Sequence, residues 1–68
     1  MRIKIIVKFK DGDSFEQVVK FNTIIDAGDY IVKTFSGQFI LLSGGENKGL
    51  LVKQEEIRYV YWEILAEE

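Results

Sequence analysis

The chain has 68 residues, a formal net charge of −2 at pH 7, and no cysteine, histidine or proline. Because chains shorter than about 100 residues rarely divide, we expect one domain over residues 1–68. Without cysteine and histidine the chain has no disulfide, lacks the usual zinc ligands and lacks the commonest general base. We therefore expect no enzymatic activity, no metal site and no cofactor.

Two further exclusions concern disorder and membranes. Apolar residues make up 47% of the chain, which is too many for a disordered segment. No apolar run approaches the roughly 18 residues of a membrane span, and the N-terminus lacks the apolar block of a signal peptide. We expect a folded, cytoplasmic protein without membrane contact.

Residues 2–10 alternate as a half-buried strand does. One face is apolar and the other basic, with Ile6 as the exception: Ile3, Ile5, Val7 and Phe9 against Arg2, Lys4, Lys8 and Lys10. Asp11-Gly12-Asp13 follows, and a glycine after an aspartate accepts the positive φ of tight hairpin turns. Because residues 15–21 alternate again, the sequence predicts a β-hairpin over residues 2–21.

The middle of the chain predicts a second hairpin followed by a loop. Residues 22–29 are expected to form a connection with room for one brief strand, and residues 30–35 a strand because they are rich in β-branched and aromatic side chains. Ser36-Gly37 is then a turn and residues 38–42 the second strand of this hairpin. Residues 43–49 are polar and glycine-rich, which predicts a loop, and residues 50–53 form a short strand.

The C-terminal residues fit two periodicities. Helical spacing relates Ile57, Val60, Tyr61, Ile64 and Leu65, whereas strand alternation separates Val60, Trp62 and Ile64 from Tyr59, Tyr61 and Glu63. No residue suited to an N-cap precedes the segment, and Glu67 and Glu68 would meet the negative end of a helix dipole. We predict a strand, with a C-terminal helix as the alternative.

Five or six short strands predict an all-β fold, either a small five- to six-stranded antiparallel barrel or a curved sheet. The alternative is an α+β fold with a C-terminal helix packed on a β-meander. Lys10-Asp11-Gly12 between two strands, and residues 49–60 with Ile57 at a turn, resemble the hairpin and the closing strand-turn-strand of Sm-like and SH3-like barrels. The resemblance implies that Ile57 plugs the barrel end. It implies no RNA site, because Lys53-Gln54 stand where the Sm family has an Arg-Gly pair, and that family's opening helix is absent.

Three groups of residues are candidates for binding. Tyr59 and Tyr61 share one face of the last predicted strand, and aromatic side chains anchor protein interfaces and stack on bases. The glycine loop could hold a partner or a small anion through its backbone amides, with Gly44, Gly45, Asn47 and Lys48 as its contact residues. The third group is basic: Arg2, Lys4, Lys8 and Lys10. These residues either form a face for phosphate or pair with the glutamates of the last fourteen residues across neighbouring strands.

Predicted strands in the later half of the chain carry apolar residues on both faces. A single sheet or small barrel has one interior, so the outer side chains need cover from elsewhere. We expect a homo-oligomer or an obligate partner, unless a C-terminal helix provides the cover.

The function hypothesis that follows is a non-catalytic interaction module that self-associates and binds a protein partner. In its short, acidic chain it resembles small adaptors and phage-type inhibitors. The first alternative is an RNA or single-stranded nucleic-acid binder that uses the basic residues. The second is capture of a small anionic ligand between subunits, near Lys48 and the glycine loop.

Overall fold

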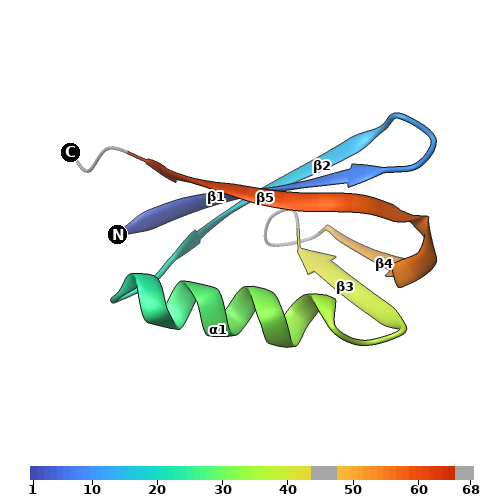
Figure 1. Cartoon of the computed structure of the whole chain (residues 1–68). Helices are drawn as coiled ribbons and strands as arrows, with labels where there is room; N and C mark the ends of the chain where they lie inside the picture. The colour runs from blue at the N-terminus through green and yellow to red at the C-terminus, as the bar shows by residue number, and fades with distance from the viewer. Residues whose placement is uncertain (44–47, 66–68) are drawn as a thin grey trace.

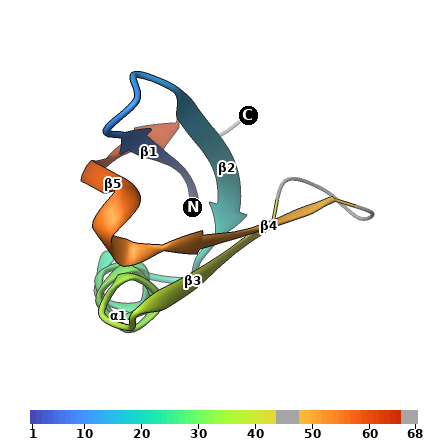
Figure 2. The same ribbon diagram turned by 90° about the vertical axis from the view of Figure 1, so that its right-hand side faces the viewer.

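The computed structural model describes residues 1–43 and 48–65 as two antiparallel sheets and one helix. Strands β1 (Arg2–Phe9), β2 (Ser14–Lys20) and β5 (Ile57–Leu65) form a sheet in the order β2-β1-β5, and β3 (Phe39–Ser43) pairs with β4 (Gly49–Lys53). Helix α1 (Ile24–Phe35) precedes β3, and a 3-10 turn η1 (Gln54–Glu56) joins β4 to β5. Helix α1 and the β3–β4 hairpin lie on the same side of the three-stranded sheet (Figures 1 and 2).

The prediction of a mostly β protein is confirmed, but the closed barrel is not formed by the residues described. The five strands remain divided between a three-stranded and a two-stranded sheet. Helix α1, which the sequence did not predict, follows β2 where a barrel would continue with another strand. The main prediction of an all-β chain is therefore corrected to a β-rich fold with one short helix.

The first hairpin forms where it was predicted. Its register runs from Arg2 opposite Lys20 to Lys8 opposite Ser14. Gly12 has a φ of +98°, in the region that favours glycine. The carboxylate of Asp11 accepts a hydrogen bond of 2.9 Å from the backbone N–H of Asp13, which closes the turn locally.

The central strand β1 provides the core of the molecule. Its alternating residues Ile3, Ile5 and Val7 are fully buried and face helix α1 and the β3–β4 hairpin. Ile3 and Ile5 cluster with Ala27 of α1, and Val7 clusters with Ile40 and Leu42 of β3. Ile6 points to the opposite face and is nevertheless buried, because it lies between Glu16 of β2 and Tyr61 of β5 in the middle of the sheet.

Helix α1 is the main correction to the sequence-based expectations. Residues 30–35, predicted as a strand, and most of the predicted connection over residues 22–29 are helical, so the second predicted hairpin does not exist. Thr23 is the N-cap, and its hydroxyl oxygen accepts a hydrogen bond of 3.1 Å from the backbone N–H of Asp26. Packing of Ala27 and Ile31 on the sheet overrides the strand propensity of the β-branched residues.

The remaining strand predictions are confirmed. The C-terminal segment is strand β5, which pairs with β1 from Arg2 opposite Leu65 to Phe9 opposite Ile57, so the alternative of a C-terminal helix is wrong. Residues 39–43 and 49–53 form β3 and β4. Within residues 1–43 and 48–65, no helix combines the length and apolar character needed to cross a membrane.

Candidate interaction surfaces

Many large apolar side chains remain on the surface although helix α1 covers part of the sheet. Among the described residues, these side chains are each at least 40% exposed: Val18, Ile24, Ile25, Val32, Phe39, Leu41, Leu50, Leu51, Tyr59, Tyr61, Trp62 and Ile64. Isolated apolar residues on a surface are ordinary, whereas contiguous apolar patches mark interaction sites. The strand register and the helix geometry group most of these residues into three surfaces.

The outer sheet face is the side of the sheet β2-β1-β5 that turns away from α1. Tyr59 and Tyr61 lie on it next to each other, opposite Lys8 and Ile6 of β1, with ring centroids 5.9 Å apart. Both rings are exposed by 40–49%. The two tyrosines predicted as partner-binding residues therefore form one aromatic pair on an open sheet.

Three of the four predicted basic residues share this outer sheet face. Arg2, Lys4 and Lys8 alternate along β1, and Lys20 of β2 joins them opposite Arg2. Lys10 lies beyond the end of β1, where its backbone N–H donates to the carbonyl of Glu56 at 2.9 Å. Acidic residues occupy the same face, because Glu63 lies opposite Lys4 and Glu16 lies opposite Ile6. The register thus provides both a basic row and one cross-strand pair of opposite charges.

The glycine loop is mostly outside the described residues. Gly44, Gly45 and Asn47 lie outside the described residues, whereas Lys48 is exposed and Gly49 begins β4. The hypothesis of a small anionic ligand near Lys48 therefore stays a prediction.

The second surface is the hairpin face, the side of the β3–β4 hairpin that turns away from the core. Leu41 lies opposite Leu51, both 66% exposed, and Phe39 lies opposite Lys53. Ile40 and Leu42, which alternate with these residues, are buried in the core. The alternation read from the sequence for residues 39–42 is confirmed, with an apolar side chain on either face.

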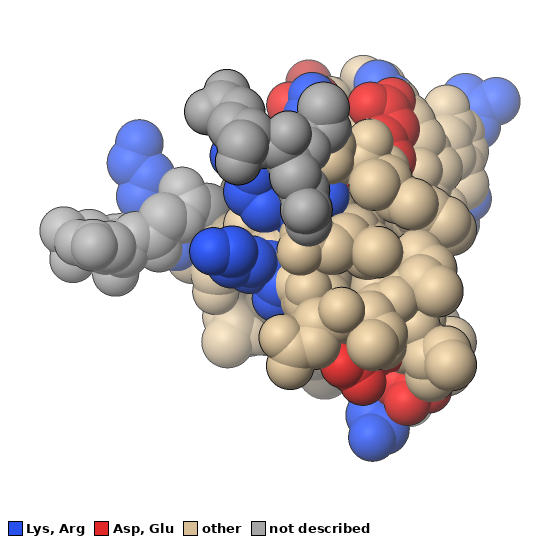
Figure 3. Space-filling view, turned by 90° about the vertical axis from the view of Figure 1, so that its left-hand side faces the viewer, with Lys and Arg blue, Asp and Glu red and all other residues tan. Residues whose placement is uncertain are grey.

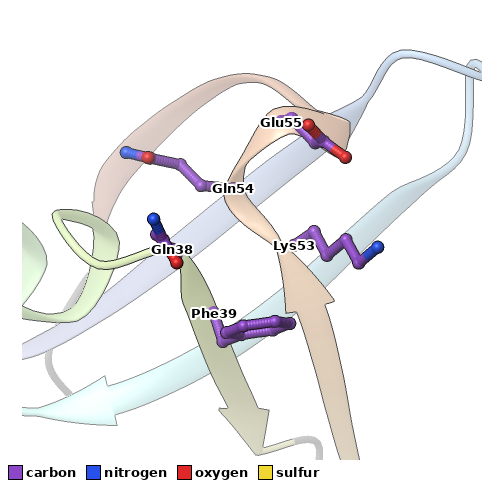
Figure 4. A pocket seen from close by; sticks show the side chains of 5 residues that line it. All are labelled: Gln38, Phe39, Lys53, Gln54 and Glu55. Carbon is purple, nitrogen blue, oxygen red and sulfur yellow. The ribbon is translucent and has the colours of Figure 1, made fainter.

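A hollow of about 330 Å³ adjoins this hairpin face, lined by Gln38, Phe39, Lys53, Gln54 and Glu55 (Figure 4). The backbone N–H of Gln54 donates to the carbonyl of Gln38 at 2.8 Å, and the Gln54 side chain donates to the carbonyl of Phe35 at 3.0 Å. A second hollow, of about 570 Å³, lies between the β1–β2 turn and β4, with Phe9, Phe15 and Leu51 in its wall. Asp11, Asp13 and Glu56 also line the second hollow, but within the described residues no group of three or more acidic side chains is placed to hold a metal ion.

The third surface is the α1–β5 face, made of Ile24, Ile25, Gly28 and Val32 of the helix with Trp62 and Ile64 of the strand. Trp62 lies opposite Ile5, and Ile64 lies opposite Ile3. Directly opposed residues in an antiparallel sheet share a face, so both side chains project on the side where α1 packs. Sequence reasoning missed the helical part of this face because residues 24–32 were not recognised as a helix.

Comparison with known proteins adds no further constraint. No family model matches the chain, and neither a curated protein nor a solved structure matches it.

Proposed function

We propose that the protein is a non-catalytic interaction module that associates with copies of itself and with a protein partner through exposed apolar surfaces. The observation that carries the proposal is the hairpin face, where Leu41 and Leu51 lie opposite each other and are both 66% exposed. The outer sheet face adds an exposed tyrosine pair. Aromatic side chains contribute strongly to protein interfaces because they bury large area with little loss of conformational freedom.

The free energy gained by burying exposed apolar side chains favours association. Fully burying a large apolar side chain contributes about 1.5–3 kcal/mol, so several such side chains outweigh the low end of the cost of association, about 4 kcal/mol. A domain of about 60 residues buries only about 60% of its unfolded surface, and its own core is correspondingly small. Association therefore covers apolar surface that one copy cannot bury.

We also propose that the fold is an open relative of SH3-like barrels. β4, η1 and β5 follow one another as strand, single 3-10 turn and strand. Ile57, the first residue of β5, packs against the cluster of Val7, Ile40 and Leu42. This arrangement supports the plugging role that the resemblance implied for Ile57.

Sedimentation velocity of the full chain from micromolar to millimolar concentration tests self-association. The proposal predicts that the sedimentation coefficient rises with concentration. A single monomeric species throughout the range would contradict it.

Partner binding is tested by replacing the tyrosine pair. Tyr59→Ala and Tyr61→Ala should reduce capture of a purified partner, whereas Val18→Ala, an exposed apolar residue on the β2 side of the same face, is the matched control. Equal capture by all three variants would show that the outer sheet face is not the binding surface.

A second candidate function, binding of single-stranded nucleic acid, is favoured by one specific observation. Arg2, Lys4 and Lys8 share the outer sheet face with the tyrosine pair, and Lys8 lies directly opposite Tyr59. Single-strand binders combine basic grooves with stacking aromatic rings. The net charge of −2 and the acidic residues Glu16 and Glu63 on that face favour the protein partner as the first proposal.

Fluorescence anisotropy with a labelled oligonucleotide distinguishes the two functions. Nucleic-acid binding predicts an affinity that falls steeply as salt rises, because phosphate contacts release counterions. It also predicts a larger loss for Lys8→Ala, beside Tyr59, than for Lys10→Ala, which lies off the face. No binding at low salt would exclude this function.

A further inference from the structure

Strand β4 has one edge that no described strand pairs with, because it hydrogen-bonds to β3 alone. The larger hollow runs along this edge: Leu50, Leu51, Val52 and Lys53 follow one another in β4, and all of them line it. Consecutive side chains of a strand point to opposite faces, so a hollow lined by all four follows the edge of the strand. Figure 2 shows β4 on the side of β3 that is away from α1.

The core is incompletely covered at this edge. Leu50 lies opposite Leu42 and therefore projects on the core face of the β3–β4 hairpin. Leu42 is fully buried, whereas Leu50 remains 40% exposed. Phe9 and Phe15 line the same hollow from the side of the β1–β2 hairpin. A further strand beside β4 would place apolar side chains between Leu50 and these two rings.

The β4 edge also lacks the charges that protect other edges of the fold. An unpaired strand edge presents free N–H and C=O groups to another strand, and charged residues within the strand oppose such pairing. Both open edges of the three-stranded sheet carry such residues, Glu16 in β2 and Arg58 and Glu63 in β5. In β4 the single charged residue, Lys53, is the last residue of the strand.

Strand β4 is complementary to a second copy of itself. When two β4 strands run antiparallel about a two-fold axis at Leu51, each Leu50 lies opposite Val52 and each Gly49 opposite Lys53 of the other copy, so all five residues pair. A shift by one residue would place outer side chains opposite core side chains. A shift by two residues in either direction would pair only three residues of each strand. The five-residue register also leaves room for Lys53, because a glycine lies opposite it.

This register extends the hairpin face across both copies. Leu41 lies opposite Leu51 within one chain, and both side chains are 66% exposed. Pairing through Leu51 therefore aligns four leucines in one row across a four-stranded sheet β3-β4-β4-β3. Leucines that lie side by side in such a row cover part of one another's exposed surface.

Charges at the two ends of β4 identify the second copy as the occupant. Uncharged surface alone does not, because the face in Figure 3 also carries a broad uncharged area. Lys48 immediately precedes β4, and Glu55 and Glu56 follow it in η1; all three are exposed. Antiparallel pairing places the start of one β4 beside the end of the other, so Lys48 of each copy approaches the two glutamates of its counterpart.

We propose that two copies of the chain form a two-fold dimer by antiparallel pairing of their β4 strands, with Leu51 at the axis. This inference rests on the proposed self-association and assigns it a strand edge. Leu50 and Val52 of each copy extend the core into the hollow of the other, and Lys48 pairs with the glutamates of η1.

Single cysteines test the register, because the chain has no cysteine of its own. Leu51→Cys and Leu41→Cys replace side chains of equal exposure on the same face. Opposed Cα atoms at Leu51 would lie about 4.5–5.5 Å apart, within reach of a disulfide, whereas the two Leu41 positions would be three strand spacings apart, about 14 Å. At a concentration where each variant is dimeric by sedimentation equilibrium, Leu51→Cys should form linked dimers at least about tenfold faster under mild oxidation. Non-reducing electrophoresis measures the rates, and circular dichroism verifies folding.

A charge exchange tests the same geometry with every leucine in place. Lys48→Glu sets glutamates against Glu55 and Glu56 of the other copy and should raise the dimer dissociation constant several-fold. Adding Glu55→Lys and Glu56→Lys to the same chain makes the ends complementary again and should restore the constant. A triple variant that dimerises no more tightly than Lys48→Glu alone would overturn the antiparallel pairing.

The outcomes separate this inference from the proposed function. If wild type dimerises but the two cysteine variants link at equal rates, the β4 edge is not the interface, while self-association stands. If wild type stays monomeric at millimolar concentration, self-association fails and this dimer fails with it.

Discussion

Gly28 offers a test of helix α1 at the level of a single methyl group. Gly28→Ala adds a Cβ in helical backbone where nothing lies within 4 Å, so the substitution creates no clash. Alanine is favoured over glycine in a helix interior by about 0.8–1.0 kcal/mol. For a domain of 60–100 residues, about 1 kcal/mol raises the melting temperature by about 4–8 °C. We predict a rise of this size at low micromolar concentration, where association contributes least.

Thermal unfolding followed by circular dichroism measures this effect, and Gly12→Ala is the matched control. Gly12 also has open space around its Cβ position, but its φ of +98° is a strained conformation for alanine. Gly12→Ala should therefore destabilise the protein by about 1–3 kcal/mol. An unchanged or lower melting temperature for Gly28→Ala would refute the open helical environment assigned to this residue.

Three further substitutions test the elements that carry the surfaces. Thr23→Ala removes the N-cap hydrogen bond to Asp26 and should destabilise the protein by about 1 kcal/mol, measured by urea unfolding. Tyr30→Phe removes the hydroxyl that accepts the hydrogen bond from the buried Gln17 amide, whose Oε1 already lacks a partner, and should lower the free energy of unfolding by about 1–3 kcal/mol. Adding Gln17→Leu should recover most of that loss, and a lack of recovery would contradict the burial of the amide. Ile40→Ala should cost about 2–5 kcal/mol, whereas Leu41→Ala, exposed on the hairpin face, should stay within about 0.5 kcal/mol; similar losses would contradict the assigned faces of β3.

The strands that alternate cleanly were predictable from the sequence. In β1 the alternation of isoleucine and valine with basic residues identified the buried face, because only one face of this strand meets the core. Ile6 broke the pattern for a reason that lies elsewhere in the chain. It is buried by Tyr61 and Glu16 on the neighbouring strands, and their register could not be known before the sheet was assembled.

Helix α1 was missed although one local signal was present. Thr23 and Asp26 have the spacing of an N-terminal capping motif. The absence of an N-cap residue was one of the two reasons for predicting no helix at the C-terminus. The β-branched residues of the segment and Gly28 lower its intrinsic helix propensity. Tertiary packing of Ala27 and Ile31 on β1 stabilises the helix, and that contact spans more than twenty residues of chain.

The candidate surfaces were predictable where the element type was correct. Strand alternation alone predicts that Tyr59 and Tyr61 share one face of β5. It also predicts that Leu41 and Leu42 project from opposite faces of β3. The exposure of Ile25 and Val32 on one helix could not be foreseen, because residues 24–35 were predicted as a connection and a strand. A side chain's face depends on the period of its element, so an error in element type relocates every residue within it.

A dilution series followed by amide NMR tests most directly whether exposed apolar surface drives association. Spectra of the full chain from micromolar to millimolar concentration report on each described residue separately. We predict concentration-dependent shifts at exposed apolar residues, among them Leu41 and Leu51 of the hairpin face and the tyrosine pair of β5, with a matching fall in translational diffusion. Amide positions and diffusion that stay constant over the whole series would show that the apolar faces remain in water, and would contradict the account.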